Sequence, residues 1–138
     1  IKLDGREGFA VRIPGLFGLP RRSGLVHNLL MYAKYNTSFS SPESPIFWSG
    51  MHVADAADAI LKLLPKINNN FLSVNIGYCG KLSINTLLEI INDLYKTDLR
   101  SEFEHPNFEI DLSLYRDLTS ATVSTLREGI KKVGNEIG

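Results

Sequence analysis

The sequence predicts an α/β protein of a single domain, mostly helical, with short strands that form an incomplete sheet. Stretches of apolar and β-branched residues alternate with stretches whose apolar residues recur at helical spacing. The length of 138 residues suits one domain over residues 1–138, and no linker divides it. Since the predicted strands are few and short, we expect the first of them to belong to a larger sheet whose other strands lie outside this sequence.

The predicted elements follow one another as strand and helix, in strict alternation. The predicted strands cover residues 9–13, 46–48, 71–76 and 108–112. The predicted helices cover residues 23–35, 55–64, 84–94 and 123–137. The stretch 37–45 is rich in Ser and Pro and is predicted to be a loop.

Residues typical of helix ends and of turns set these boundaries. Ser23, Asp55 and Ser83 are predicted N-caps, because their side chains can accept a hydrogen bond from a first-turn amide. Pro14-Gly15 is predicted to end the first strand, and the glycine and proline that follow keep the chain irregular up to the first helix.

Composition excludes several classes of partner. Lys plus Arg and Asp plus Glu both number 15, so no excess of positive charge favours nucleic acid or an anionic membrane. No apolar run or signal peptide indicates a membrane or secreted protein. Cys79 is the single cysteine, which favours a cytoplasmic protein with an inert, packed thiol. The chain begins with Ile1, which leads us to expect a fragment or a processed product.

The stretch Arg12 to Gly18 is the first candidate ligand site. A strand that ends in Pro-Gly places backbone at the carboxyl edge of a sheet, where ligands bind in open α/β folds. Glycine also permits close approach of a ligand to the backbone. A tight turn after an edge strand explains the same residues, and both interpretations stay open.

Four other patterns have a structural explanation that we favour. His52 and Asp55 lack the further ligands or nucleophile that a metal or catalytic site needs. The turn Gly77 to Gly80 before Ser83 has the shape of a phosphate cradle, but a turn and an N-cap explain it. Asp111 with Arg116, and the pair Arg21-Arg22, are predicted to be solvated charges, although Arg21-Arg22 could face a phosphate.

Four blocks in order resemble the second half of the extended short-chain dehydrogenase/reductase (SDR) family, which includes NAD-dependent sugar-nucleotide epimerases, dehydratases and reductases. These blocks are Val11-Arg-Ile-Pro-Gly-Leu-Phe-Gly18, Trp48-Ser-Gly-Met-His-Val-Ala-Asp-Ala-Ala-Asp-Ala-Ile60, Val74-Asn-Ile-Gly-Tyr-Cys-Gly-Lys-Leu-Ser-Ile84, and Ile110-Asp-Leu-Ser113 with Ser124-Thr-Leu-Arg-Glu-Gly-Ile130. The resemblance implies the C-terminal portion of a Rossmann-like fold, with the N-terminal cofactor-binding domain absent.

The resemblance also implies a cofactor, a substrate and the residues that contact them. In the complete protein the cofactor would be NAD or NADP, and Pro14, Gly15 and Leu16 would contact it. A sugar or sugar-nucleotide would contact the residues Phe17, Arg21, Arg22 and Trp48.

No tyrosine is followed four residues later by lysine, so the family's Tyr-x-x-x-Lys pair is missing and no catalytic residue is assigned. We expect the chain alone to be inactive and to associate with itself or with the missing half. The alternative is a non-catalytic SDR-like ligand-binding or protein-interaction module.

Overall fold

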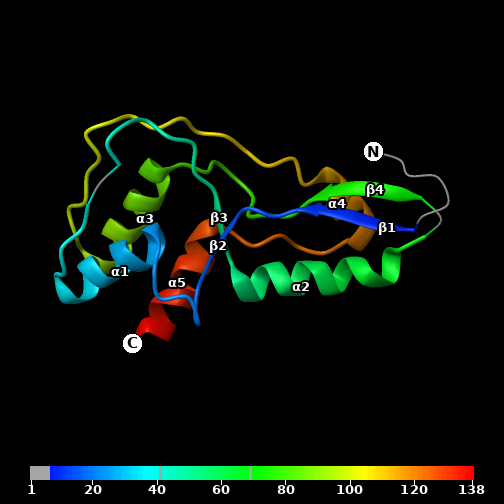
Figure 1. The fold of residues 1–138 in the computed structure, drawn as a ribbon, viewed down its shortest axis with the longest axis horizontal. Helices are drawn as coiled ribbons and strands as arrows, with labels where there is room; N and C mark the ends of the chain where they lie inside the picture. Colours follow the sequence, from blue (N-terminus) through cyan, green and yellow to red (C-terminus); the bar gives the residue numbers. More distant parts are fainter. Residues whose placement is uncertain (1–6, 41, 69) are drawn as a thin grey trace.

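The computed structural model describes residues 7–40, 42–68 and 70–138, and it confirms an α/β fold with short parallel strands (Figure 1). The strands are β1 (Gly8–Arg12), β2 (Gly15–Phe17), β3 (Gly50–His52) and β4 (Phe71–Asn75). The helices are α1 (Leu25–Tyr35), α2 (Val53–Leu63), α3 (Ile84–Tyr95), α4 (Ser113–Thr119) and α5 (Leu126–Ile137), and a 3₁₀ turn, η1 (Leu64–Lys66), follows α2. None of the described helices is long and apolar enough to cross a membrane.

Two separate pairs of parallel strands form the sheet structure. β1 pairs with β4, with Arg12 opposite Asn75 at the carboxyl end of both strands. β2 pairs with β3, with Gly15 opposite Gly50 and Phe17 opposite His52. Only Ile13 and Pro14 separate β1 from β2, so the first strand of one pair leads directly into the first strand of the other.

The helices cover the two strand pairs differently. α2 runs alongside β1 and β4, whereas α1, α3 and α5 gather at the other end of the molecule, around the β2–β3 pair (Figure 1). α5 packs against β3 and α3, and α3 packs against α1. The buried core joins both parts, because Val74 of β4 and Leu63 of α2 belong to the same cluster as Leu87 of α3 and Ile130 of α5.

The predicted strands at 46–48 and 108–112 are wrong. The strand lies instead at Gly50–His52, where the backbone pairs with β2. Phe108 makes only an isolated antiparallel bridge to Leu82, and the chain then turns into α4, which the sequence did not predict. Alternating apolar and acidic residues indicate a segment with one buried side, which is why a strand was predicted. A loop that packs on the core buries one side in the same way and needs no strand partner.

Strand β2 was also missed, since residues 14–20 were predicted to be irregular. Its three residues carry no strand pattern of their own, and their conformation depends on pairing with β3, far along the chain. The pairing places the backbone of Gly15 so close to Ser49 that a Cβ at Gly15 would lie 3.2 Å from the Ser49 carbonyl oxygen.

The predicted N-caps had mixed outcomes. Ser83 caps α3 as predicted, with its Oγ accepting a hydrogen bond of 3.0 Å from the Thr86 amide. Ser23 does not cap α1, because the N-cap position is occupied by Gly24, whose φ of 92° favours glycine. Asp55 lies in the first turn of α2, and the N-cap is His52, whose Nδ1 accepts from the Ala54 amide at 3.0 Å.

We expect the substitutions Ser83→Ala and Ser23→Ala to differ in their effect on stability. Ser83→Ala removes a side-chain cap and should lower the free energy of unfolding by about 1 kcal/mol. Ser23→Ala should change it by less than about 0.5 kcal/mol, since Ser23 is exposed and caps no helix. Urea denaturation followed by circular dichroism measures both values, and equal losses would contradict the cap assignment.

Candidate functional site

A cleft of about 320 Å³ lies at the carboxyl ends of β1 and β4, the edge where open α/β sheets bind ligands. We call it the edge cleft. Its polar lining includes Arg12 and Asn75, the last residues of the two strands, together with Ser49 and Asp111. The side-chain nitrogen of Asn75, Nδ2, donates to the backbone carbonyl oxygen of Asp111 at 3.1 Å, which holds the loop on this side of the cleft.

A second cavity, of about 130 Å³, lies between β2 and the start of α1. We call it the Trp48 cavity. Its lining residues are Gly15, Leu16, Phe17, Arg21, Ser23, Gly24, Leu25, Val26, Trp48 and Ser49. Ser49 also lines the edge cleft, so the two hollows adjoin at this residue and together could hold one elongated ligand.

The Trp48 cavity has the electrostatic character of an anion site. The Arg21 guanidinium donates through Nη1 to the Leu16 carbonyl oxygen at 3.0 Å and lies next to Gly24, the N-cap of α1. No side chain caps that helix end, and its first residues, Leu25 and Val26, line the cavity. Guanidinium and helix terminus both attract negative charge, and none of the lining residues is acidic.

Most of the residues predicted for cofactor and substrate lie close together in the structure. Five of them, Gly15, Leu16, Phe17, Arg21 and Trp48, line the Trp48 cavity. Pro14 lines the adjoining edge cleft. Arg22 is exposed and lines neither hollow. Which ligand each residue contacts stays a prediction.

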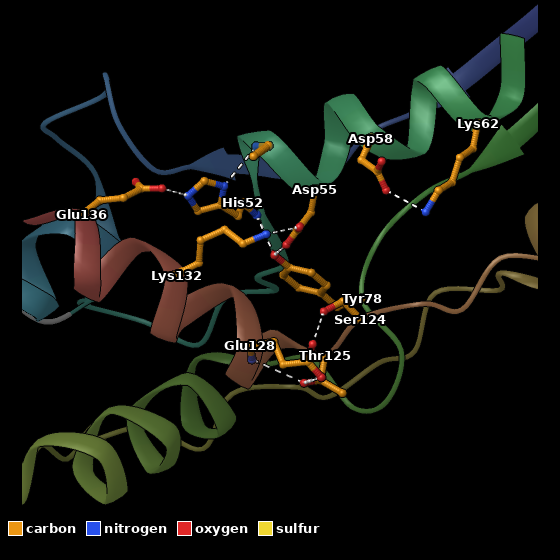
Figure 2. Close-up of polar contacts among 11 residues, drawn as sticks. His52, Asp55, Asp58, Lys62, Tyr78, Ser124, Thr125, Glu128, Lys132 and Glu136 are labelled. Atoms are coloured by element: carbon orange, nitrogen blue, oxygen red, sulfur yellow. Dashed lines mark hydrogen bonds and ion pairs between the residues drawn. The ribbon is translucent and has the colours of Figure 1, made fainter.

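A partly buried polar cluster supports β3, the strand that pairs with β2 (Figure 2). The Tyr78 hydroxyl accepts a hydrogen bond of 3.0 Å from the His52 amide, at the end of β3, and donates to the Asp55 carboxylate in α2. Lys132 of α5 pairs with the same carboxylate. The His52 ring lies 2.6 Å from Glu136, also in α5, and its side chain is only 2 % exposed. The cluster therefore joins β3, α2 and α5 at one point.

The protonation states in this cluster follow from its contacts. Partial burial acts to raise the pKa of Asp55, but hydrogen bonds from Lys132 and Tyr78 outweigh it and leave this pKa below its ordinary value. Burial, and the hydrogen bond to Asp55, raise the pKa of the Tyr78 hydroxyl well above its usual range, so this hydroxyl stays protonated. Asp55 is thus a charged structural acceptor at neutral pH.

The other sequence patterns have structural roles in the described residues. A Cβ at Gly77 would lie 2.4 Å from the Ile110 side chain, so glycine is needed there for packing. Asp111 accepts from both the amide and the hydroxyl of Ser113 at the start of α4, and these bonds lower its pKa. The Cys79 thiol faces the Ser124 carbonyl oxygen at 3.5 Å. Among the residues that the structure describes, no group of His, Cys, Asp and Glu could hold a metal ion.

Solved structures share this fold. The chain is similar to MoeE5 in complex with UDP-glucuronic acid and NAD (TM-score 0.70, 16 % identity, 92 % of this chain and 46 % of that chain covered). It is also similar to the UDP-glucose 4-epimerase of Thermotoga maritima with UDP-glucose (TM-score 0.71, 14 % identity, 96 % and 46 % covered). A third is the dTDP-glucose 4,6-dehydratase of Bacillus anthracis in complex with NAD (TM-score 0.69, 15 % identity, 92 % and 43 % covered).

These similarities show the fold of the chain and how much of the similar structures it covers. The chain has the fold of the C-terminal part of the extended SDR enzymes, and it spans less than half the length of the structures it matches. No protein-family model matches the sequence, and no curated protein is matched by it.

The lowered pKa of Asp55 predicts how stability depends on pH. A carboxyl group whose pKa is lower in the folded than in the unfolded protein stabilises the fold above the unfolded value, near 3.8, and loses this effect as the pH falls through the folded value. We expect Asp55→Asn to lower the free energy of unfolding by about 1 kcal/mol at pH 7. The difference from the unsubstituted protein should shrink below about pH 4.

Urea denaturation from pH 7 to pH 3 measures this difference. Asp58→Asn is the matched control, because Asp58 lies one turn along α2 and forms an exposed pair with Lys62. A constant loss for Asp55→Asn at all pH values would contradict a charged Asp55 in the folded protein.

Proposed function

We propose that this chain is the substrate-binding half of an NAD(P)-dependent epimerase, dehydratase or reductase that acts on a sugar or sugar-nucleotide. The Trp48 cavity is the observation that carries the proposal. It combines a guanidinium, an uncapped helix N-terminus and an aromatic wall, which suit a ligand with both a phosphate group and a ring. Similar structures have been solved with UDP-glucose, UDP-glucuronic acid and NAD, which supports this ligand class.

In the proposed complex, the edge cleft and the Trp48 cavity bind different parts of the ligand. Arg21 and the N-terminus of α1 would bind the diphosphate, because a guanidinium and an uncapped helix start, both among the residues that line the Trp48 cavity, attract negative charge. The edge cleft would take the sugar, since Arg12, Asn75 and Asp111 provide donors and acceptors for hydroxyl groups. Ser49, on the boundary of both, would lie near the bond between them.

Among the described residues, one surface suits a part of the cofactor, the nicotinamide ring. Ile13 is 46 % exposed, and with Pro14 it presents an apolar surface at the edge cleft, which suits one face of a nicotinamide ring. The described residues contain no glycine-rich turn for the pyrophosphate. NAD or NADP would supply hydride transfer when bound, and this chain would contribute one wall of its site through Pro14, Gly15 and Leu16.

The remaining half of the site would dock on the open side of the β1–β4 pair. Among the described residues β1 pairs only with β4, which leaves the other edge of β1 unpaired, whereas α4 packs against β4. Parallel strands are normally covered on both faces and rarely stand in pairs. An α/β unit that adds a parallel strand to β1 would continue this sheet.

Two exposed leucines at the end of α2 and the start of η1 support docking of the partner half near the β1–β4 pair. Asp55 and Asp58 line a small cavity with Tyr115 of α4, so this flank of α2 faces α4. Leu64, the first residue of η1, follows Asp55 by about two and a half helical turns and therefore projects from the side opposite to Asp55. Leu61 and Leu64 are 63 % and 52 % exposed, which indicates a helix of the partner half as the covering element.

Trp48, the single tryptophan, reports directly on ligand binding in its cavity. We expect UDP-glucose to quench Trp48 fluorescence in the unsubstituted chain. Arg21→Gln should raise the dissociation constant about tenfold, because it removes a charged donor to the phosphate. The adjacent Arg22→Gln is the matched control and should change the constant less than about twofold, since Arg22 lines neither hollow. Equal effects of both substitutions, or no quenching at all, would contradict the proposed function.

The docking surface predicts self-association of the isolated chain. Unpaired strand edges and exposed apolar side chains favour association between copies of a chain. We therefore expect the isolated chain to elute above its monomer mass of 15.4 kDa at high concentration. The double substitution Leu61→Gln and Leu64→Gln should shift the mass toward the monomer and leave the melting temperature within a few degrees of its original value. Size-exclusion chromatography with light scattering measures the mass, and a clean monomer of the unsubstituted chain would contradict the docking surface.

A further inference from the structure

The side chain of Glu136 connects the last helix to the loop that carries Arg21. One carboxylate oxygen, Oε2, accepts a hydrogen bond from the Leu19 amide at 3.1 Å. The other, Oε1, lies 2.6 Å from Nε2 of His52. Leu19 and Glu136 are 117 positions apart in the sequence, so this contact exists only in the folded chain.

The loop from Gly18 to Arg21 is held between these contacts. The Arg21 amide donates to the Gly18 carbonyl oxygen at 3.1 Å, which closes the loop into a turn. Gly18 lies against the imidazole, and a Cβ at this position would be 2.6 Å from Nε2 of His52. Arg21 then reaches back to the Leu16 carbonyl oxygen. The turn is therefore held by His52 and Glu136 on one side and by Leu16 on the other.

Only a carboxylate satisfies both donors at this position. Nδ1 of His52 accepts from the Ala54 amide, so in the neutral ring the hydrogen is on Nε2, which donates to Glu136. The Leu19 amide is also a donor. A glutamine would place its NH₂ group against one of these two N–H groups, and a shorter or apolar side chain would leave both unpaired. The His52 side chain is 2 % exposed, so water cannot readily replace the lost acceptor there.

We propose that Glu136 is a positioning residue for ligand binding, which acts through Leu19 and His52 to hold the Arg21 turn in its binding orientation. The proposal rests on the proposed function, because it assigns a role to Glu136 in the anion site of the Trp48 cavity. Glu136 itself lines neither the Trp48 cavity nor the edge cleft. Its side chain is 29 % exposed, so a substitution there should not prevent folding.

The test compares Glu136→Gln with Glu128→Gln, a substitution in the same helix. Glu128 accepts from the Ser124 hydroxyl and the Thr125 hydroxyl at the start of α5, away from the Arg21 turn. In the ligand-free chain, hydrogen exchange measured by NMR should show the Leu19 amide exchanging about tenfold faster in Glu136→Gln and unchanged in Glu128→Gln. In a Trp48 fluorescence titration with UDP-glucose, Glu136→Gln should raise the dissociation constant about fivefold and Glu128→Gln should not.

The two measurements separate this inference from the proposed function. If the unsubstituted chain does not bind UDP-glucose, the proposed function fails, while Leu19 exchange still decides whether Glu136 holds the turn. Unchanged Leu19 exchange in Glu136→Gln would overturn the inference. Equal UDP-glucose affinity of Glu136→Gln and the unsubstituted chain would overturn it as well. Parallel changes in both variants that follow only their melting temperatures would show a purely structural role and would also overturn it.

Discussion

The position of the whole site depends on one buried hydroxyl group, that of Tyr78. It accepts from the amide that ends β3 and donates to the carboxylate in the first turn of α2, so it fixes the junction of strand and helix. α5 lies directly against this side chain, since a Cβ at Gly129 would be 2.2 Å from the hydroxyl oxygen. The Trp48 cavity depends on this junction, because β3 pairs with β2 and the chain segment before β3 carries Trp48.

The local arrangement of charged groups, and not the net charge of the chain, determines the electrostatic character of the site. The chain has no net charge, which in the sequence gives no indication of an anionic ligand. In the structure, Arg21 and the uncapped start of α1 meet in one cavity that no acidic residue lines, and Asp111 lies in the adjoining cleft. The Trp48 cavity is thus lined by a cation alone, whereas the edge cleft is lined by Arg12 as well as by acidic residues. On the proposed function, the phosphate of the ligand would lie in the first and its hydroxyl groups in the second.

The sequence predicted those parts of the fold that depend on local pattern. The helical periodicity that ends at Tyr35, and the cap at Ser83, are properties of neighbouring residues, and both are confirmed. β2 and α4 were missed because their conformations depend on contacts with distant segments. The sequence pattern gave no reason to distinguish Arg21 from Arg22. The folded turn does, because Arg21 lines the Trp48 cavity and Arg22 does not. No local signal indicates Glu136, whose partners are far away in the sequence.

The proposed docking edge, on β1, is separated from β2 by only Ile13 and Pro14, so a shift of β1 on docking would be passed on to β2. β1 would receive the strand of the partner half, and β2, which follows immediately, forms a wall of the Trp48 cavity. A partner strand that shifts β1 must move Pro14 and therefore the backbone of Gly15. The β2–β3 pairing and the Tyr78 contacts limit that movement, because they hold β2 from the opposite side. On the proposed function, the isolated chain would therefore keep the anion-binding part of the site, whereas the nicotinamide wall at Pro14 would reach its final position only when the partner half is docked.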